Sequence, residues 1–322
     1  MVNRNGVPPR AVLAARKRLF DTIRKFFDQR HFLEVDTPIM VESPGLEPHL
    51  EAFSTVEIGP DRICTPRYLH TSPEYAMKRL LAQDTGHIYQ LARVFRNGER
   101  SSTHIPEFTM LEWYRSPGSL QDIMQDTEAL LVAAAEAVDG PWRLQGCQRL
   151  SMSEAFLQVG LPDPLDYPEV DALRRALNVR FVADDTWNDV FHRAFLERVE
   201  PSFPSDRATL LHGFPASMAA LARLDPHDCR KAERFEVYVG SVELANAFGE
   251  LTDPQEQRRR FEVDLAERAQ LGRPAYPIDE AFLADLENID EAAGIALGVD
   301  RLLMLCLMLP CIQDAVPFSP RD

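Results

Sequence analysis

The chain has few cysteines and no paired-cysteine motif. Its five cysteines are odd in number, and no two of them have the C-x-x-C spacing that zinc ligands and redox dithiols show. They lie at Cys64, Cys147, Cys229, Cys306 and Cys311. We therefore expect a reduced, cytoplasmic protein without structural zinc.

Long apolar runs are also missing. No segment approaches the roughly 20 apolar residues that a membrane-spanning helix needs. Residues 1–6 lack the apolar stretch of a signal peptide. We therefore do not expect the protein to associate with a membrane.

Positive charge is scarce as well. The chain has 35 Lys and Arg against 50 Asp and Glu, a net charge of −15. RNA capture relies on neutralising phosphates with Lys and Arg, so a tRNA partner is not favoured. The cluster Arg258–Arg260 lies in a helical pattern over 255–268 and is more typical of a solvated helix face than of an RNA site.

What the chain does have is a predicted hairpin with an arginine-rich connection. Residues 89–95 alternate as a strand, and in 108–115 the side chains of Phe108, Met110, Glu112 and Tyr114 fall on one face. Arg96 ends the first strand. An arginine held there can meet a phosphate with a rigid fork of donors, which a lysine cannot do.

A second segment is nearly free of side-chain bulk on one face. Gly294, Ala296 and Gly298 share a strand face on which a flat base or a substrate chain could lie against the backbone. Asp300 is expected to cap the next helix, and Arg301 enters its first turn. A glycine strand packed tightly on a helix is the structural alternative.

Acidic residues mark two further segments. In the first, Ser72 is predicted to cap a helix, with Pro73 at its first position and Glu74 in its first turn. In the second, Glu243 and Glu250 are seven residues apart, so a regular strand would put them on opposite faces. We expect a break in the alternation, at Gly249.

Together these segments resemble the three motifs of the class II aminoacyl-tRNA synthetases of the lysyl type. The hairpin is similar to motif 2, the bare strand to motif 3, and the amphipathic helix before Pro38 to motif 1. The resemblance implies an α+β fold, mainly an antiparallel sheet flanked by helices. Motif 1 forms a dimer interface in that family, so it also implies a homodimer.

The resemblance covers nearly the whole chain. It implies that 1–322 is a single catalytic domain with an insertion around 141–205 and no anticodon-binding domain. No repeats or low-complexity segments interrupt it.

The family's functional positions can be carried over residue by residue. The ATP-binding positions match Arg96, Asn97, Gly98, Glu243, Leu244, Gly298 and Arg301, with Arg96 and Arg301 also the catalytic pair. The substrate-binding positions match Ser72, Pro73, Glu74, Tyr114, Glu250 and Ala296. Mg²⁺ is expected at Glu243 and Glu250, since hard carboxylate oxygens suit it. An equally reasonable role for Glu250 is to meet the substrate ammonium.

Ala296 stands where lysyl-tRNA synthetases have the middle glycine of motif 3. One methyl group there should disfavour an ordinary α-amino acid, a discrimination of roughly 1–3 kcal/mol. The chain thereby resembles the paralogues that activate (R)-β-lysine as an adenylate and attach it to a lysine side chain of translation elongation factor P. ATP, (R)-β-lysine and elongation factor P are the expected substrates.

Two departures keep alternatives open. Gly98 replaces a glutamate of the family pattern, and Ile105 replaces an asparagine that contacts the substrate. One alternative is a minimal lysyl-type synthetase that charges tRNA or makes an adenylate for a small-molecule ligase. The other is a non-catalytic, synthetase-like regulator.

Overall fold

The computed structural model describes residues 8–180 and 182–318. Its contacts divide the chain into two compact units. One unit combines the residues up to Trp142 with those from Leu251 onward, and the other is the continuous segment Arg143–Glu250. The prediction of one catalytic domain with an insertion at 141–205 and no anticodon-binding domain stays a prediction.

The first unit is built on the predicted hairpin. Strand β5 (Ile88–Phe95) pairs antiparallel with β6 (Glu107–Arg115), and β6 pairs antiparallel with β11 (Ala293–Gly298). The short β1 (Leu33–Glu34) runs parallel to β5, so the strand order in this unit is β1-β5-β6-β11. Strand β6 of motif 2 therefore pairs directly with β11, the strand of motif 3.

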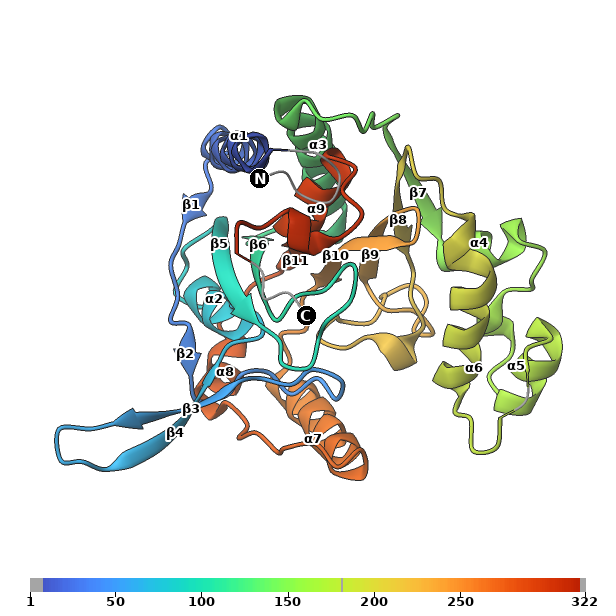
Figure 1. The fold of residues 1–322 in the computed structure, drawn as a ribbon. Helices are drawn as coiled ribbons and strands as arrows, with labels where there is room; N and C mark the ends of the chain where they lie inside the picture. Colours follow the sequence, from blue (N-terminus) through green and yellow to red (C-terminus); the bar gives the residue numbers. More distant parts are fainter. Residues whose placement is uncertain (1–7, 181, 319–322) are drawn as a thin grey trace. The chain divides into compact units, whose positions relative to one another are not determined.

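Three helices cover one face of these strands. They are α1 (Pro9–Asp28), α3 (Leu120–Val138) and α9 (Val299–Cys306), which lie together in Figure 1. The apolar side of α1 is buried as predicted, and Phe27 stacks on Tyr89 with ring centroids 4.5 Å apart. The odd-numbered side chains of β6 pack against these helices, and the even-numbered ones lie on the opposite face of the sheet.

A second group of elements lies in the same unit. It contains α2 (Glu74–Leu81), α7 (Pro254–Gln270), α8 (Glu280–Leu286) and the three-stranded sheet β2 (Met40–Val41), β4 (Cys64–Leu69) and β3 (Ser54–Ile58). The rings of Tyr75 and Phe282 stack 4.4 Å apart and join α2 to α8.

The second unit has its own strands and core. Its strand order is β10 (Val242–Gly249), β9 (Arg234–Val239), β8 (Ala208–His212) and β7 (Cys147–Ser151). All pairings are antiparallel except β7 with β8. The helices α4 (Met152–Gln158), α5 (Val170–Leu177) and α6 (Trp187–Ala194) pack an apolar core that includes Phe156 and Phe191.

These elements confirm the predicted α+β fold with mainly antiparallel strands flanked by helices. The helix expected over 255–268 is present as α7. Among the described residues, no helix is both long enough and apolar enough to cross a bilayer.

Candidate active site

The centre of the candidate site is a buried carboxylate on β6. Ser72 donates a hydrogen bond to Glu112 Oε1 at 2.5 Å, and the Tyr114 hydroxyl donates to Glu112 Oε2 at 2.9 Å. Glu112 is only 1% exposed. Sequence analysis did not select Glu112, although its alternation with Tyr114 already placed the two on one strand face.

The electrostatics of Glu112 suit a cationic ligand. Burial, and then the charge of Glu74, raise the pKa of Glu112 to about 8, against the opposing effect of Ser72, Tyr114 and Lys78. A cation brought against this carboxylate would restore its ionised form. The site therefore favours a ligand with an ammonium group.

Glu74 lies at the start of α2. The side chain of Lys78 donates to Glu74 Oε1 at 2.6 Å, and Lys78 is fully buried. The cap predicted at Ser72 is wrong by one residue, because the helix begins at Glu74 and Pro73 is its N-cap. Ser72 Oγ still accepts a hydrogen bond from the Glu74 backbone N–H at 3.0 Å, so it links the helix start to Glu112.

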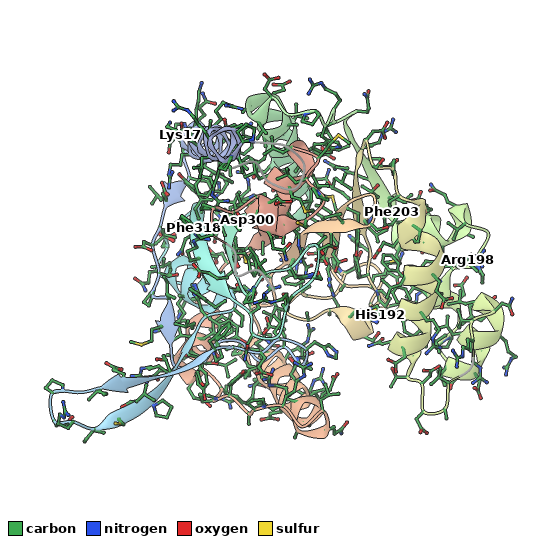
Figure 2. The ribbon with its side chains drawn as sticks, viewed as in Figure 1. Lys17, His192, Arg198, Phe203, Asp300 and Phe318 are labelled. Carbon is green, nitrogen blue, oxygen red and sulfur yellow. The ribbon has the colours of Figure 1, made fainter. Side chains whose placement is uncertain are left out.

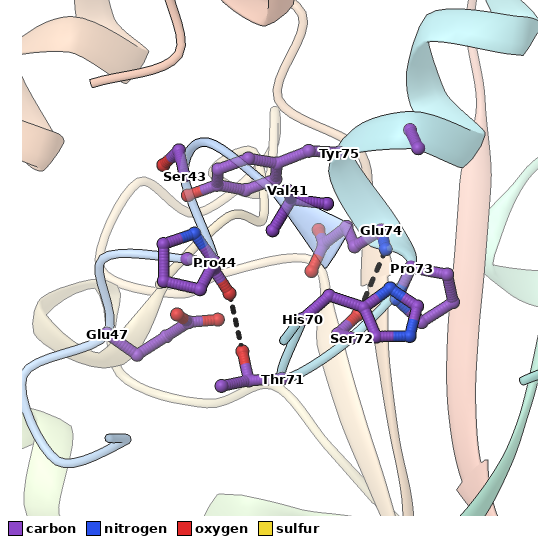
Figure 3. A pocket seen from close by; sticks show the side chains of 12 residues that line it. Val41, Ser43, Pro44, Glu47, His70, Thr71, Ser72, Pro73, Glu74 and Tyr75 are labelled. Carbon is purple, nitrogen blue, oxygen red and sulfur yellow. Dashed lines mark hydrogen bonds between the residues drawn. The ribbon is translucent and has the colours of Figure 1, made fainter. Parts of the chain in front are cut away.

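A small pocket opens beside Glu74. It is lined by residues within 41–47 and 70–76, and Figure 3 shows Glu47 and Glu74 on opposite walls. The Thr71 hydroxyl donates to the Pro44 carbonyl at 2.7 Å and ties the two lining segments together.

Strand β11 places the predicted selectivity residue next to Glu112. In the β11–β6 ladder Ala296 is opposite Glu112, and Gly294 is opposite Tyr114. Opposite residues project from the same face of a sheet. The methyl group of Ala296 therefore lies beside the buried carboxylate, on the glycine-lined face that the sequence predicted.

Arg96 follows directly after β5. Its Nε donates to the Thr71 carbonyl at 3.4 Å, and its guanidinium lies 5.3 Å from the centre of the Phe108 ring. Asn97 Nδ2 donates to Glu51 Oε1 at 2.9 Å. Gly98 has φ +76°, a left-handed conformation that disfavours the glutamate of the family pattern.

Arg301 lies in the first turn of α9, as predicted. Its Nε donates to the Thr103 carbonyl at 3.1 Å, and a Cβ at Gly298 would lie 3.5 Å from Arg301 Cδ. Burial lowers the pKa of His104, and the charges of Arg301 and Arg96 lower it further. The loop that carries His104 is therefore within the electrostatic reach of both arginines.

The predicted capping role of Asp300 is wrong. Gly298 is the N-cap of α9, and Asp300 instead accepts a hydrogen bond from the Thr109 backbone N–H at 2.7 Å. Asp300 (labelled in Figure 2) also pairs with Arg16 of α1, and Arg16 Nη2 donates to Thr109 Oγ1 at 2.8 Å. It joins α1, β6 and α9 next to Arg301.

The remaining predicted site residues belong to the second unit. The break in alternation lies between Glu243 and Ala245, where the pairing with β9 shifts by one residue, and the prediction of Gly249 is wrong. A Cβ at Gly249 would lie 2.3 Å from Glu233 Oε2, so a larger residue there would displace the Glu233 side chain. Leu244 is buried at the irregularity.

The bulge returns Glu243 and Glu250 to one face, because one extra residue reverses the alternation beyond it. Glu250 follows β10 and forms an isolated bridge to Ala222. Among the described residues, no cluster of three or more His, Cys, Asp or Glu side chains could hold a metal. Two carboxylates still fit Mg²⁺, since this ion usually keeps several waters and binds substrate phosphates.

The comparisons with known proteins identify the family of the chain. The model of the family "tRNA synthetases class II (D, K and N)" matches residues 7–322. The chain therefore belongs to the class II aminoacyl-tRNA synthetase family, whose members use ATP.

Several curated relatives have a more specific name, elongation factor P–(R)-β-lysine ligase. The protein of Proteus mirabilis (strain HI4320) is 43% identical over 314 residues, covering 96% of this chain and 94% of the relative. That of Edwardsiella ictaluri (strain 93-146) is 43% identical over 317 residues, covering 97% and 95%. That of Haemophilus influenzae (strain PittGG) is 41% identical over 312 residues, covering 95% and 94%.

Proposed function

We propose that this protein uses ATP to activate (R)-β-lysine as an adenylate and transfers the β-lysyl group to a lysine side chain of translation elongation factor P. The observation that carries the proposal is the buried Glu112, held by Ser72 and Tyr114 and lying opposite Ala296. The carboxylate of Glu112 can bind an amine, and the methyl group of Ala296 narrows the strand face beside it. The names of relatives 43% identical over nearly the whole chain support the same activity.

In the first half-reaction, a carboxylate oxygen of the amino acid attacks the α-phosphorus of ATP. The bond from that phosphorus to the bridging oxygen breaks, and pyrophosphate leaves. This step needs alignment and charge neutralisation more than proton transfer. We assign Arg96 to the α-phosphate and Arg301 to the γ-phosphate, with Asn97, Gly98, Leu244 and Gly298 completing the nucleotide site.

Mg²⁺ bound through Glu243 and Glu250 would neutralise phosphate charge in this step. The two carboxylates lie on one face because of the bulge at Leu244. Glu250 could instead meet the substrate ammonium, and Ser72, Pro73, Glu74, Tyr114 and Ala296 form the rest of the amino-acid site.

In the second half-reaction, the neutral ε-amine of the acceptor lysine attacks the acyl carbon of the adenylate. An amide bond forms, AMP leaves, and the amine loses a proton. A protein acceptor rather than tRNA is supported by the charges of α7. Arg258 pairs with Glu280, and both Arg259 and Arg260 pair with Glu256, so the cluster is largely neutralised.

We also propose that the protein is a homodimer. Several apolar side chains of the motif 1 region are exposed in the single chain, as expected of an interface. They are Leu13, Leu33, Ile39 and Met40. Light scattering at micromolar concentration should give twice the chain mass of 36.5 kDa, and a monomeric mass would reject the dimer.

The function is tested by competition between acceptors. The protein is given ATP, Mg²⁺ and (R)-β-lysine, with elongation factor P and lysine tRNA present together. We expect one β-lysyl unit on the factor in its intact mass spectrum, and uncharged tRNA. Charged tRNA with unmodified factor would establish a minimal synthetase instead. Absence of ATP–pyrophosphate exchange with any diamino acid would favour a non-catalytic regulator, the alternative raised by Gly98 and Ile105.

A further inference from the structure

The pocket beside Glu74 contains two buried polar groups that the reaction described above does not use. Ser43 is 7% exposed, and its hydroxyl has no hydrogen-bond partner among the described residues. The Oε2 atom of Glu47 is also buried without a hydrogen-bond partner there. Both residues line the pocket. Burying polar atoms without hydrogen bonds costs free energy. Two such atoms lining one pocket therefore indicate that a ligand binds there.

The loop that carries Glu47 is held in a fixed position. Arg268, which is fully buried, donates to the Glu47 carbonyl at 2.8 Å and to the Leu50 carbonyl at 2.7 Å. Gly45 has φ +113°, and a Cβ there would lie 2.6 Å from Glu47 Oε2. Any other residue at position 45 would displace this carboxylate and would be strained at that φ. The local structure therefore makes room for the side chain of Glu47 inside the pocket.

Repulsion between Glu47 and Glu74 favours a cation between them. Burial, and then the charge of Glu74, raise the pKa of Glu47, while its own backbone N–H, Arg96 and Arg268 act in the opposite direction. Glu47 and Glu74 reach the pocket from opposite walls (Figure 3). Lys78 already pairs with one oxygen of Glu74 at 2.6 Å. A positive group between the two carboxylates would offset their mutual repulsion.

We propose that Glu47 is a substrate-binding residue, which together with Glu74 holds the β-ammonium of (R)-β-lysine, with the Ser43 hydroxyl as a further acceptor. This inference rests on the proposed function and names residues for one amine of its substrate. The β-ammonium is chosen over the ε-ammonium because of Arg96. Its Nε donates to the Thr71 carbonyl at 3.4 Å, in the same pocket wall. Arg96 marks the end where the carboxylate reacts, and the β-amine is the nearer of the two amines to that carboxylate.

The test compares three ligands that differ only in their amines. They are (R)-β-lysine, (R)-3-aminohexanoic acid, which lacks the ε-amine, and 6-aminohexanoic acid, which lacks the β-amine. Their dissociation constants are measured by calorimetry for the wild type, for Glu47→Gln, and for the matched control Glu42→Gln. Glu42 is an exposed glutamate in the same segment and does not line the pocket.

We expect Glu47→Gln to weaken (R)-β-lysine and (R)-3-aminohexanoic acid about 10- to 100-fold, as for loss of a hydrogen bond to a charged group. Binding of 6-aminohexanoic acid should change less than about twofold, and Glu42→Gln should resemble the wild type for all three. Glu47→Asp, which retains the charge, and Ser43→Ala should each give a smaller loss for the first two ligands. Melting temperatures identify any variant that is not folded.

Two results with the variants would overturn the assignment. One is that Glu47→Gln and Glu42→Gln bind (R)-β-lysine equally well. The other is that Glu47→Gln loses the same factor for 6-aminohexanoic acid as for (R)-β-lysine, because Glu47 would then shape the pocket without meeting the β-ammonium. A wild type that binds a monoamine but not (R)-β-lysine would reject the proposed function, while the two monoamines still decide the role of Glu47. A wild type that binds none of the three would reject both.

Discussion

Ala296 and Glu112 are opposite residues in the ladder between β11 and β6. Opposite side chains in an antiparallel pair have Cβ atoms about 4.5–5.5 Å apart. The only methyl group on the glycine-lined face of β11 is therefore next to the buried carboxylate of Glu112. The residue that we propose to set amino-acid selectivity is thus beside the carboxylate that we propose to bind an amine.

Replacing Ala296 by glycine should relax the choice of amino acid. We expect Ala296→Gly to raise ATP–pyrophosphate exchange with α-lysine about 10- to 100-fold relative to (R)-β-lysine, because one methyl group is worth roughly 1–3 kcal/mol of discrimination. Ala293→Gly is the control, since it removes a methyl from the opposite face of the same strand. Unchanged exchange with both isomers would show that Ala296 does not set selectivity.

Replacing Arg96 by lysine should slow activation without unfolding the protein. A lysine keeps the charge but loses the planar fork of donors, and removing one such preorganised donor commonly costs about 10²–10³ in kcat. Steady-state exchange kinetics should show this loss with an unaltered melting temperature. Arg93→Lys, three residues earlier in β5, is the control and should keep the wild-type kcat. An equally active Arg96→Lys would remove Arg96 from the catalytic pair.

Glu112 should make the stability of the ligand-free protein depend on pH. Its folded pKa of about 8 is above the ordinary value of 4.5, so the folded state binds the proton more tightly than the unfolded state does. The stability that this tighter proton binding contributes is complete below pH 4.5. It is lost as the pH rises toward 8, at no more than about 1.4 kcal/mol per pH unit.

Denaturant unfolding at pH 5 and pH 8 tests this dependence. Glu112→Gln cannot lose a proton, so its loss of stability between the two values should be smaller than that of the wild type. Added (R)-β-lysine should reduce the difference further, because its ammonium favours the ionised carboxylate. Parallel losses for both proteins would mean that Glu112 is ionised throughout this range.

Removing Asp300 should destabilise the first unit. Asp300→Ala leaves the guanidinium of Arg16 and the N–H of Thr109 without their shared acceptor. Breaking a buried ion pair costs about 3–5 kcal/mol, and we expect the lower end because Arg16 is partly exposed. Urea unfolding measures the loss. Asp290→Ala, at an exposed position, should change stability by less than about 0.5 kcal/mol, and an equal effect of both would contradict the assigned role.

The sequence predicted the strands, and the positions of Arg96 and Arg301 next to them, because these signals are local. The alternation over 89–95 and 108–115, and the spacing from Gly294 to Arg301, are sufficient to place β5, β6 and β11. Glu112 was on the predicted face, but nothing local shows that Ser72, forty residues away, would bind it.

Two of the errors concern contacts that are not visible in the local sequence. Asp300 has the local appearance of a helix cap, yet its partners Thr109 and Arg16 are 191 and 284 residues away. Gly249 looked like the break in β10 because glycine often marks one. The bulge lies at Leu244 instead. Its position is set by the pairing of β10 with β9, which the local sequence does not show. Ser43 and Glu47 have no sequence signal, since only the folded pocket makes their polar atoms unusual.

The contact of Asp300 with Arg16 and Thr109 also bears on the order in which a newly made chain can fold. Arg16 and Thr109 are synthesised early, but their acceptor is added only after about 190 further residues of translation. The continuous unit Arg143–Glu250 does not depend on residues made so much later, since all of its strands are close together in the sequence. We therefore expect the second unit to become protease-resistant on the ribosome before the first. Helix α1 and the motif 2 hairpin would then be the parts that depend on chaperones until β11 and α9 emerge.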